Sequence, residues 1–332
     1  MKTLGIDEMK FMNPQNHGQC FLRFLLLIIL SFSMLTGCSS QGEEAIDIDL
    51  ANRSYNEARS NSPEISDAIY FGFDRRLETK EDVKMYVPLL NYLRKETGYR
   101  FEIHVTPVNS SVVEELGQGK IQMAAIGTLG YLQASETFGA IITVKGLNNE
   151  DKDMYKAAIV TRPNSQIKVI SDIRGRSFAF GDLASTQGHL IPRIMLSQKG
   201  IEIISLKYYQ NFASHSEVAN AVMSGRFEAG GMQDTLAKSL EDAGLLKIIA
   251  VSEEYPSSGI AFAKGVDKDV IDKITQALVK FDPEGEDKAG LYHWERSEMP
   301  HGFTYANNED YNVLRNWADK FGLLKKMDGE SK

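Results

Sequence analysis

Short apolar runs alternate with amphipathic stretches along most of the chain, beginning near residue 68. Apolar runs such as 68–73 and 122–127 have the length and composition of buried strands. The stretch 79–98 is typical of an amphipathic helix that ends at Gly98, and Pro88 within it predicts a kink or a late start. Strands that alternate with helices in this way predict an α/β fold with a largely parallel sheet.

The alternation occurs in two series, and each series predicts one α/β lobe. The second series runs from about residue 177 to 252 and includes a strand expected at 204–209. After Pro256 the pattern predicts a return to the first lobe. A cleft between two lobes is a preferred place for a small ligand. The expected segments are a signal peptide at 1–37, a tether at 38–66, the first lobe at 67–160 and 258–332, and the second lobe at 161–257.

The N-terminal segment predicts export and a lipid anchor. Arg23 precedes an apolar stretch that is shorter than the ~20 residues of a membrane-spanning helix, which indicates a signal peptide. The following "LTGC" resembles the bacterial lipoprotein box, so the mature chain would begin at a lipid-modified Cys38. A plain secretory signal is the alternative, and Met9 or Met12 is an alternative start. Because Cys20 lies in the segment to be removed, no internal disulfide is expected.

The composition argues against several classes of function. The chain has 332 residues, a formal net charge of -8 and no run of basic residues, which argues against a nucleic-acid partner. It has no HExxH motif and no paired cysteines, so we expect neither a metal site nor a cofactor. We expect a monomer.

The sequence "FGDLASTQGHLIPRIML" predicts an anion-binding helix start. Ser185 is well placed as an N-cap, with Thr186, Gln187 and Gly188 in the first turn. The first amides of a helix lack intrahelical partners and lie at the positive end of the dipole, so they attract anions. No acid occupies the position from which a capping box would form, and the alternative is that Ser185 and Thr186 only cap the helix.

A second helix start brings a histidine toward the expected cleft. Ser214 and Glu217 form a capping box, and His215 between them is placed to donate toward an oxyanion. The alternative is an ordinary surface histidine. Arg75 or Arg76, after the first strand, could contact a ligand charge, although arginines at such places are commonly solvated.

Three stretches together resemble a known family: "NSQIKVISDIRGRSF", "FAFGDLASTQGHLIPRIMLSQKGI" and "SHSEVANAVMSGRFEAG". They are similar to the phosphonate, phosphite and phosphate substrate-binding proteins of ABC importers, and the resemblance extends from about residue 69 to 281. It implies the type II periplasmic binding protein fold, in which two α/β lobes close on a ligand in the cleft between them.

The resemblance also implies roles for individual residues. Gln187 stands where the family commonly has serine, and Asn109 lies in a loop where it often has an aromatic contact. Asp234 would favour a ligand oxygen that carries a proton, or an ammonium group. As alternatives, Thr128 and Asp234 only cap helices, and Tyr155 belongs to the core. The implied ligand contacts are Ser185, Thr186, Gln187, Tyr155, His215, Asp234, Thr128 and Asn109.

The sequence therefore predicts a lipid-anchored solute-binding protein of the cell envelope. It would capture a small phosphorus oxyanion or phosphonate and deliver it to an ABC permease in the membrane. A sensor subunit for a membrane histidine kinase, or a type II receptor for another small anion, remains an alternative. We expect no enzyme, because Ser185, His215 and Asp234 follow the wrong order for an α/β-hydrolase and the first glycine of G-x-S-x-G is missing.

Overall fold

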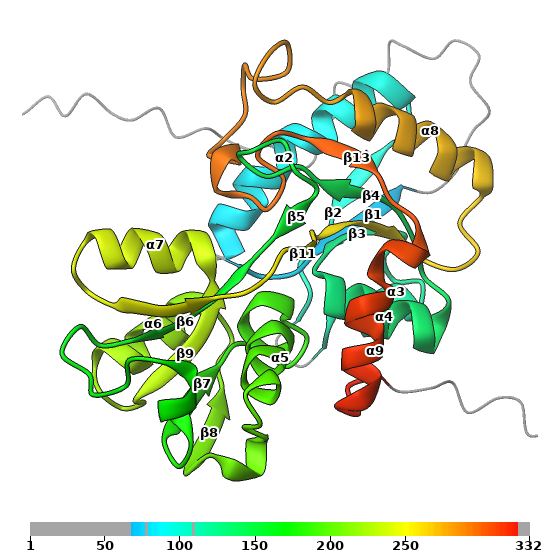
Figure 1. Cartoon of the computed structure of the whole chain (residues 1–332). Helices are drawn as coiled ribbons and strands as arrows, with labels where there is room; N and C mark the ends of the chain where they lie inside the picture. The colour runs from blue at the N-terminus through cyan, green and yellow to red at the C-terminus, as the bar shows by residue number, and fades with distance from the viewer. Residues whose placement is uncertain (1–67, 77–78, 108–109, 325–332) are drawn as a thin grey trace, which may run out of the picture. The chain divides into compact units, whose positions relative to one another are not determined.

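The computed structural model describes residues 68–76, 79–107 and 110–324 of the chain (Figure 1). These residues belong to one compact unit, Ser62–Lys332. The predicted signal peptide, the tether, Cys38 and Asn109 lie outside the described residues. Among the helices of the described ranges, none is both long enough and apolar enough to cross a membrane.

The first lobe is built on a six-stranded sheet in the order β13-β4-β12-β3-β1-β2. Strand β1 pairs in parallel with β2 and β3. Of the nine strand pairings in the two lobe sheets of the described residues, only four are parallel, so the prediction of a largely parallel sheet is wrong; the strands next to the crossovers return in the opposite direction. Strand β12, which follows the second lobe, returns to this sheet and pairs antiparallel with β3 and β4. The strands are β1 (Ile69–Phe73), β2 (Phe101–Ile103), β3 (Met123–Ile126), β4 (Ile141–Gly146), β12 (Gly259–Phe262) and β13 (Phe303–Tyr305).

Five helices accompany this sheet. Helix α2 runs through Pro88 without interruption, so the predicted late start is wrong, and Gly98 with φ of 73° follows its end. Apolar residues of α2 and α8 are buried against the strands, among them Leu89 and Ile274. The helices are α2 (Thr79–Thr97), α3 (Val112–Gly117), α4 (Thr128–Phe138), α8 (Lys268–Lys280) and α9 (Asn312–Lys320).

The second lobe is built on a five-stranded sheet in the order β10-β6-β9-β7-β8. Its last strand begins later than predicted: residues 203–205 form a short 3₁₀ helix, because Ile204 is 93% exposed and is not part of a buried run. The strands are β6 (Ala157–Thr161), β7 (Ser177–Phe180), β8 (Tyr208–Asn211), β9 (Ala229–Gln233) and β10 (Lys247–Val251), and the helices are α5 (Ile191–Gln198), α6 (His215–Met223) and α7 (Asp234–Asp242).

Short helical turns join these elements. The turn that precedes α5 is a π-helix, and the others are 3₁₀ helices. They are η1 (Ile170–Ile173), η2 (Thr186–Leu190), η3 (Ile203–Ser205), η4 (Trp294–Arg296) and η5 (Asn308–Tyr311).

Two chain segments cross between the lobes side by side. Strand β5 (Met154–Tyr155) leads from the first lobe to the second, and β11 (Tyr255–Pro256) leads back; the two pair antiparallel. Strand β6 therefore belongs to the second sheet, ahead of the boundary predicted at residue 160. The sheet at each end of this crossover gives the body two α/β lobes.

Candidate ligand-binding site

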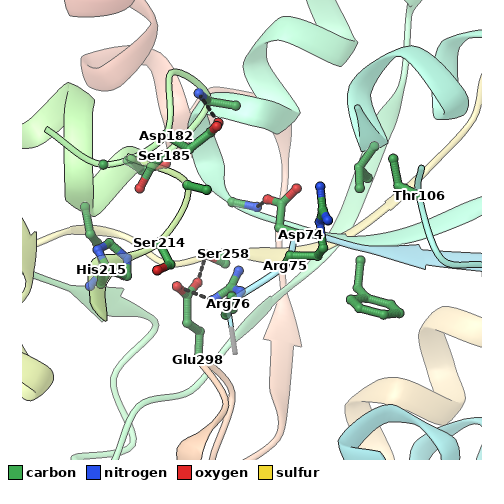
Figure 2. A pocket seen from close by; sticks show the side chains of 18 of the residues that line it. Asp74, Arg75, Arg76, Thr106, Asp182, Ser185, Ser214, His215, Ser258 and Glu298 are labelled. Carbon is green, nitrogen blue, oxygen red and sulfur yellow. Dashed lines mark hydrogen bonds and ion pairs between the residues drawn. The ribbon is translucent and has the colours of Figure 1, made fainter. Parts of the chain in front are cut away.

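A cavity of about 880 Å³ is lined by both lobes (Figure 2). The first lobe contributes the residues that follow β1, the segment around the start of α3, and the start of α2. The second lobe contributes the loop after β7 with the start of η2, and the start of α6. Of the predicted ligand contacts, the cavity wall includes Ser185, Thr186, Gln187, Tyr155 and His215.

Ser185 is the N-cap of η2, as predicted. Its Oγ accepts a hydrogen bond from the Gly188 amide at 3.0 Å. Gly188 is required for backbone packing, because an added Cβ would lie 2.9 Å from the Cα of Gly181. Glycine is therefore needed at this position because two chain segments pack closely there. The hydroxyl hydrogen of Ser185 remains available to a further acceptor.

Thr186 reaches across to the first lobe. Its Oγ1 accepts a hydrogen bond from the Leu129 amide, in the first turn of α4, at 2.8 Å. The side chain is 4% exposed. Thr186 can therefore hydrogen-bond to a ligand as a donor while this contact persists, because its oxygen is the acceptor in the bond between the lobes.

Thr128 and Tyr155 meet at the crossover. The hydroxyl of Tyr155 donates to Thr128 Oγ1 at 3.0 Å, and Thr128 Oγ1 donates to the Pro256 carbonyl at 3.0 Å. Burial raises the pKa of Tyr155, which keeps it a neutral donor. Thr128 is fully buried and is not among the residues that line the cavity, so only Tyr155 of this pair reaches the wall.

Gln187 and Asp234 are placed differently from one another. The Gln187 side chain is buried, and its Nε2 donates to the Lys156 carbonyl at 2.7 Å, which fixes it against the crossover. Asp234 is the first residue of α7 and is not among the residues that line the cavity. Burial raises the pKa of its carboxyl group.

His215 lies beside the start of η2. A Cβ on Gly188 would lie 3.1 Å from its Cε1, so the two helix starts of the second lobe converge here. Ser214 caps α6, because its Oγ accepts a hydrogen bond from the Glu217 amide at 3.2 Å. The Glu217 carboxylate accepts from the Ala213 amide and not from the Ser214 amide, so the predicted capping box is only half formed. Within the described part of the chain, the buried Nδ1 of His215 has no hydrogen-bond partner. Burial, and to a smaller extent the charge of Arg76, lowers the pKa of His215 to about 4, so the ring is neutral at neutral pH.

Asp74 lines the cavity and was not predicted from the sequence. It follows β1 directly, and its Oδ2 accepts a hydrogen bond at 2.7 Å from the amide of Gly127, the N-cap of α4. Burial raises the pKa of this carboxyl, and the carboxylate of Asp182 in the second lobe raises it further, whereas Arg76 lowers it. An acid immediately after a buried strand was the available signal.

An ion pair and a hydroxyl group bonded to it lie in the same cavity wall. Arg76 forms an ion pair with Glu298, and the hydroxyl of Ser258 donates to the same carboxylate, as Figure 2 shows. Arg76 was predicted from the sequence as a possible ligand contact, whereas Glu298 and Ser258 were not. These residues come from three distant segments, so only the fold brings them together. No group of three or more potential metal ligands occurs within 68–76, 79–107 and 110–324.

Comparison with known proteins finds a family match and two similar relatives. Residues 71–311 match the family described as the periplasmic substrate-binding protein of phosphonate ABC transporters. A probable ABC transporter phosphite binding protein, PhnD1 of Prochlorococcus marinus, is 27% identical over 198 residues, which span 55% of this chain and 60% of that protein, less than two thirds of its length. The phosphate-import protein PhnD of Mycolicibacterium smegmatis is 29% identical over 272 residues, 75% of this chain and 84% of that protein.

A solved structure supports the fold. PhnD1 from Prochlorococcus marinus, in complex with methylphosphonate, superposes with a TM-score of 0.67 at 17% identity, and the match covers 77% of this chain and 99% of that chain. At this identity the likeness establishes the fold alone. The predicted type II periplasmic binding protein fold is confirmed.

Proposed function

The chain belongs to the periplasmic substrate-binding proteins of phosphonate ABC transporters, and from this membership we propose that it captures a phosphonate, phosphite or phosphate oxyanion in the cavity. We further propose that a lipid on Cys38 anchors it in the cell envelope and that it delivers the ligand to a membrane permease. The observation that carries the capture of an oxyanion is the unpartnered Nδ1 of His215, buried where two helix starts meet.

The chemistry of this corner favours an anion with several oxygens. Helix starts direct unpaired amides and the positive end of the dipole toward one place. Ser185 adds a hydroxyl donor, and neutral His215 donates from Nδ1 in the tautomer that carries its proton there. A tetrahedral phosphorus group presents oxygens in several directions, so it accepts from Ser185, His215 and the η2 amides at once.

The crossover provides a means of closing on the ligand. Strands β5 and β11 are two residues each and are the paired segments that join the lobes. A rotation about them would bring Thr186 and Leu129 together or separate them, and closure would exclude water from the oxyanion. Hydrogen bonds in such a dry site are stronger than in water.

The printed names of the relatives support a phosphorus ligand. One relative is named for phosphite binding, one for phosphate import, and one solved structure holds methylphosphonate. All three ligands share a tetrahedral phosphorus centre with charged oxygens. Gln187, bulkier than the serine common at its position, also lines the cavity and is expected to affect which of them binds best.

The test is calorimetric titration of the purified full chain, in mild detergent, with phosphate, phosphite, methylphosphonate and 2-aminoethylphosphonate. We expect one of them to bind, and the Ser185→Ala/Thr186→Ala double variant to lose about a hundredfold or more in affinity, since two buried hydrogen bonds to a charged group are removed. If a folded chain binds none of the four, the proposed ligand class is wrong. For the anchor, Cys38→Ser is expected to release the chain from the membrane fraction.

A further inference from the structure

A second buried polar side chain lies in the cavity wall, away from His215. Thr106 follows β2 in the first lobe and is 6% exposed. Its Oγ1 is buried and has no hydrogen-bond partner among the described residues. Buried hydroxyls are nearly always paired, so an unpaired one in the wall of a cavity indicates a partner supplied from within that cavity.

The cavity wall that includes Thr106 also includes apolar side chains and hydroxyl groups. The neighbouring parts of the wall are Phe73, at 2% exposed, and Val112, at 6% exposed, with Ser110 and Ser111 at the start of α3. The hydroxyl of Ser111 already accepts from the Glu114 amide at 3.1 Å and caps α3. A group that binds to the Thr106 hydroxyl therefore also meets apolar side chains and hydroxyls, which suits an uncharged polar group.

The two unpaired atoms lie at different ends of the cavity. In Figure 2, His215 and Ser185 lie at one side, Thr106 lies at the other, and Asp74 and Arg75 lie between them. The oxyanion end and the Thr106 end are thus separated by charged residues of the segment after β1. One small inorganic anion does not reach both.

The size of the cavity agrees with this separation. An inorganic phosphate has about five heavy atoms, and at roughly 30 Å³ each, the share of a water molecule in the liquid, it fills about 150 Å³. The cavity holds about 880 Å³. Cavities of roughly 300–1,000 Å³ are typical for organic ligands.

Building on the proposed function, we propose that the ligand is an organic phosphorus compound whose substituent carries an uncharged hydroxyl or carbonyl group. The oxyanion binds at the Ser185–His215 end. The substituent passes the segment after β1, and its polar group forms a hydrogen bond with the Thr106 hydroxyl. Inorganic phosphate, phosphite and methylphosphonate fill only the first of these two places.

The test uses two ligands that differ in a single hydroxyl group. The full chain is titrated calorimetrically with 3-hydroxypropylphosphonate and propylphosphonate, beside methylphosphonate and inorganic phosphate. We expect 3-hydroxypropylphosphonate to bind most tightly, and Thr106→Val to weaken it about tenfold, the size of one buried hydrogen bond. The same variant should leave propylphosphonate and methylphosphonate within about twofold. The matched control, Thr304→Val on β13 outside the cavity, should change none of them.

Each of the other possible results contradicts a specific part of the proposal. If methylphosphonate or phosphate binds as tightly as the hydroxylated ligand, the two-ended ligand is wrong while the proposed function stands. If the hydroxylated ligand binds best and Thr106→Val does not weaken it, the assignment of Thr106 is wrong. If a folded chain binds no phosphorus compound, the proposed function fails and this inference fails with it. A melting temperature of Thr106→Val at or above that of the wild type shows that the variant is folded.

Discussion

At the scale of single residues, the cavity wall contains a neutral histidine and a carboxyl group whose charged form is disfavoured by burial. His215 presents an unpartnered Nδ1 beside the first turn of η2, and its lowered pKa keeps it uncharged. The Asp74 carboxylate accepts the hydrogen bond of the Gly127 amide at the start of α4, so this amide is not available to a ligand oxygen. Ser185 and His215 are thus donors in the second lobe, whereas Asp74 is an acceptor in the first.

The lowered pKa of His215 predicts a pH-dependent stability. The folded value of about 4 lies below the ordinary 6.5, so the unfolded chain binds more protons in between, and stability is lost as pH falls from about 6.5 to 4. We expect His215→Gln to lose less stability than the wild type over this range, because it has no imidazole to protonate. Melting temperatures at pH 4.5, 5.5, 6.5 and 7.5 measure this. Equal losses in both proteins would contradict a buried neutral His215.

Asp74 predicts discrimination between ligand charge states. A carboxylate in the wall repels a phosphonate dianion, whereas a monoanion donates its proton to it. We expect Asp74→Asn to bind methylphosphonate about tenfold more tightly at a pH where the ligand is a dianion, and with little change where it is a monoanion. Titration calorimetry at two pH values checks this, with the exposed Asp269→Asn on α8 as the matched control. An unchanged affinity at both pH values would remove Asp74 from the site.

At the scale of elements, the site depends on how η2 packs. The backbone amide of Gly181, after β7, donates to the Gly188 carbonyl at 2.7 Å, and the two Cα atoms are so close that neither residue can carry a side chain. This contact turns the start of η2 toward the start of α6. The position of Ser185 relative to His215 therefore depends on two glycines.

Gly188→Ala is expected to disrupt this arrangement. The new Cβ would lie 2.9 Å from the Cα of Gly181, a backbone atom that cannot move cheaply. We expect a loss of about 1–3 kcal/mol in unfolding free energy, as for overpacked cores, together with loss of oxyanion binding. Chemical denaturation and calorimetry measure both.

Gly127→Ala is the matched control, since its Cβ would be 3.4 Å from the nearest atom, an ordinary contact. It should cost only a few tenths of a kcal/mol at a helix N-cap. Equal losses of unfolding free energy in the two variants would show that the close approach of Gly181 and Gly188 is not the reason why residue 188 must be glycine.

At the scale of the whole body, the two lobes touch through polar and apolar contacts. Thr186 of the second lobe accepts a hydrogen bond from the Leu129 amide of the first lobe. One buried apolar cluster includes Leu129 and Leu132 of the first lobe and Leu190 and Ile191 of the second. The lobes are thus held close by groups next to the oxyanion site, which links closure to the same residues that would contact a ligand.

Thr186→Val tests this link. Removing the hydroxyl leaves the Leu129 amide without its acceptor in the second lobe. We expect the amide hydrogen of Leu129 to exchange about tenfold faster, because local opening there becomes easier. Hydrogen exchange followed by NMR reports it, with the Leu132 amide, inside the same helix, as internal control. Unchanged exchange at Leu129 would mean that this bond does not hold the lobes together.

The sequence by itself determined the elements, the two lobes and the two helix starts. Helix and strand periods, capping residues and glycine stops are local, so Ser185, Ser214 with Glu217, and the end of α2 could be predicted from short stretches. The tertiary structure alone decided which groups share the cavity. Asp74, Ser258, Glu298 and Thr106 come from segments up to 224 residues apart (298 − 74), and their hydrogen bonds and burial depend on packing between them. Long-range packing leaves no periodic signal in the chain, and for this reason the sequence indicated the helix starts at Ser185 and Ser214 and not these four residues.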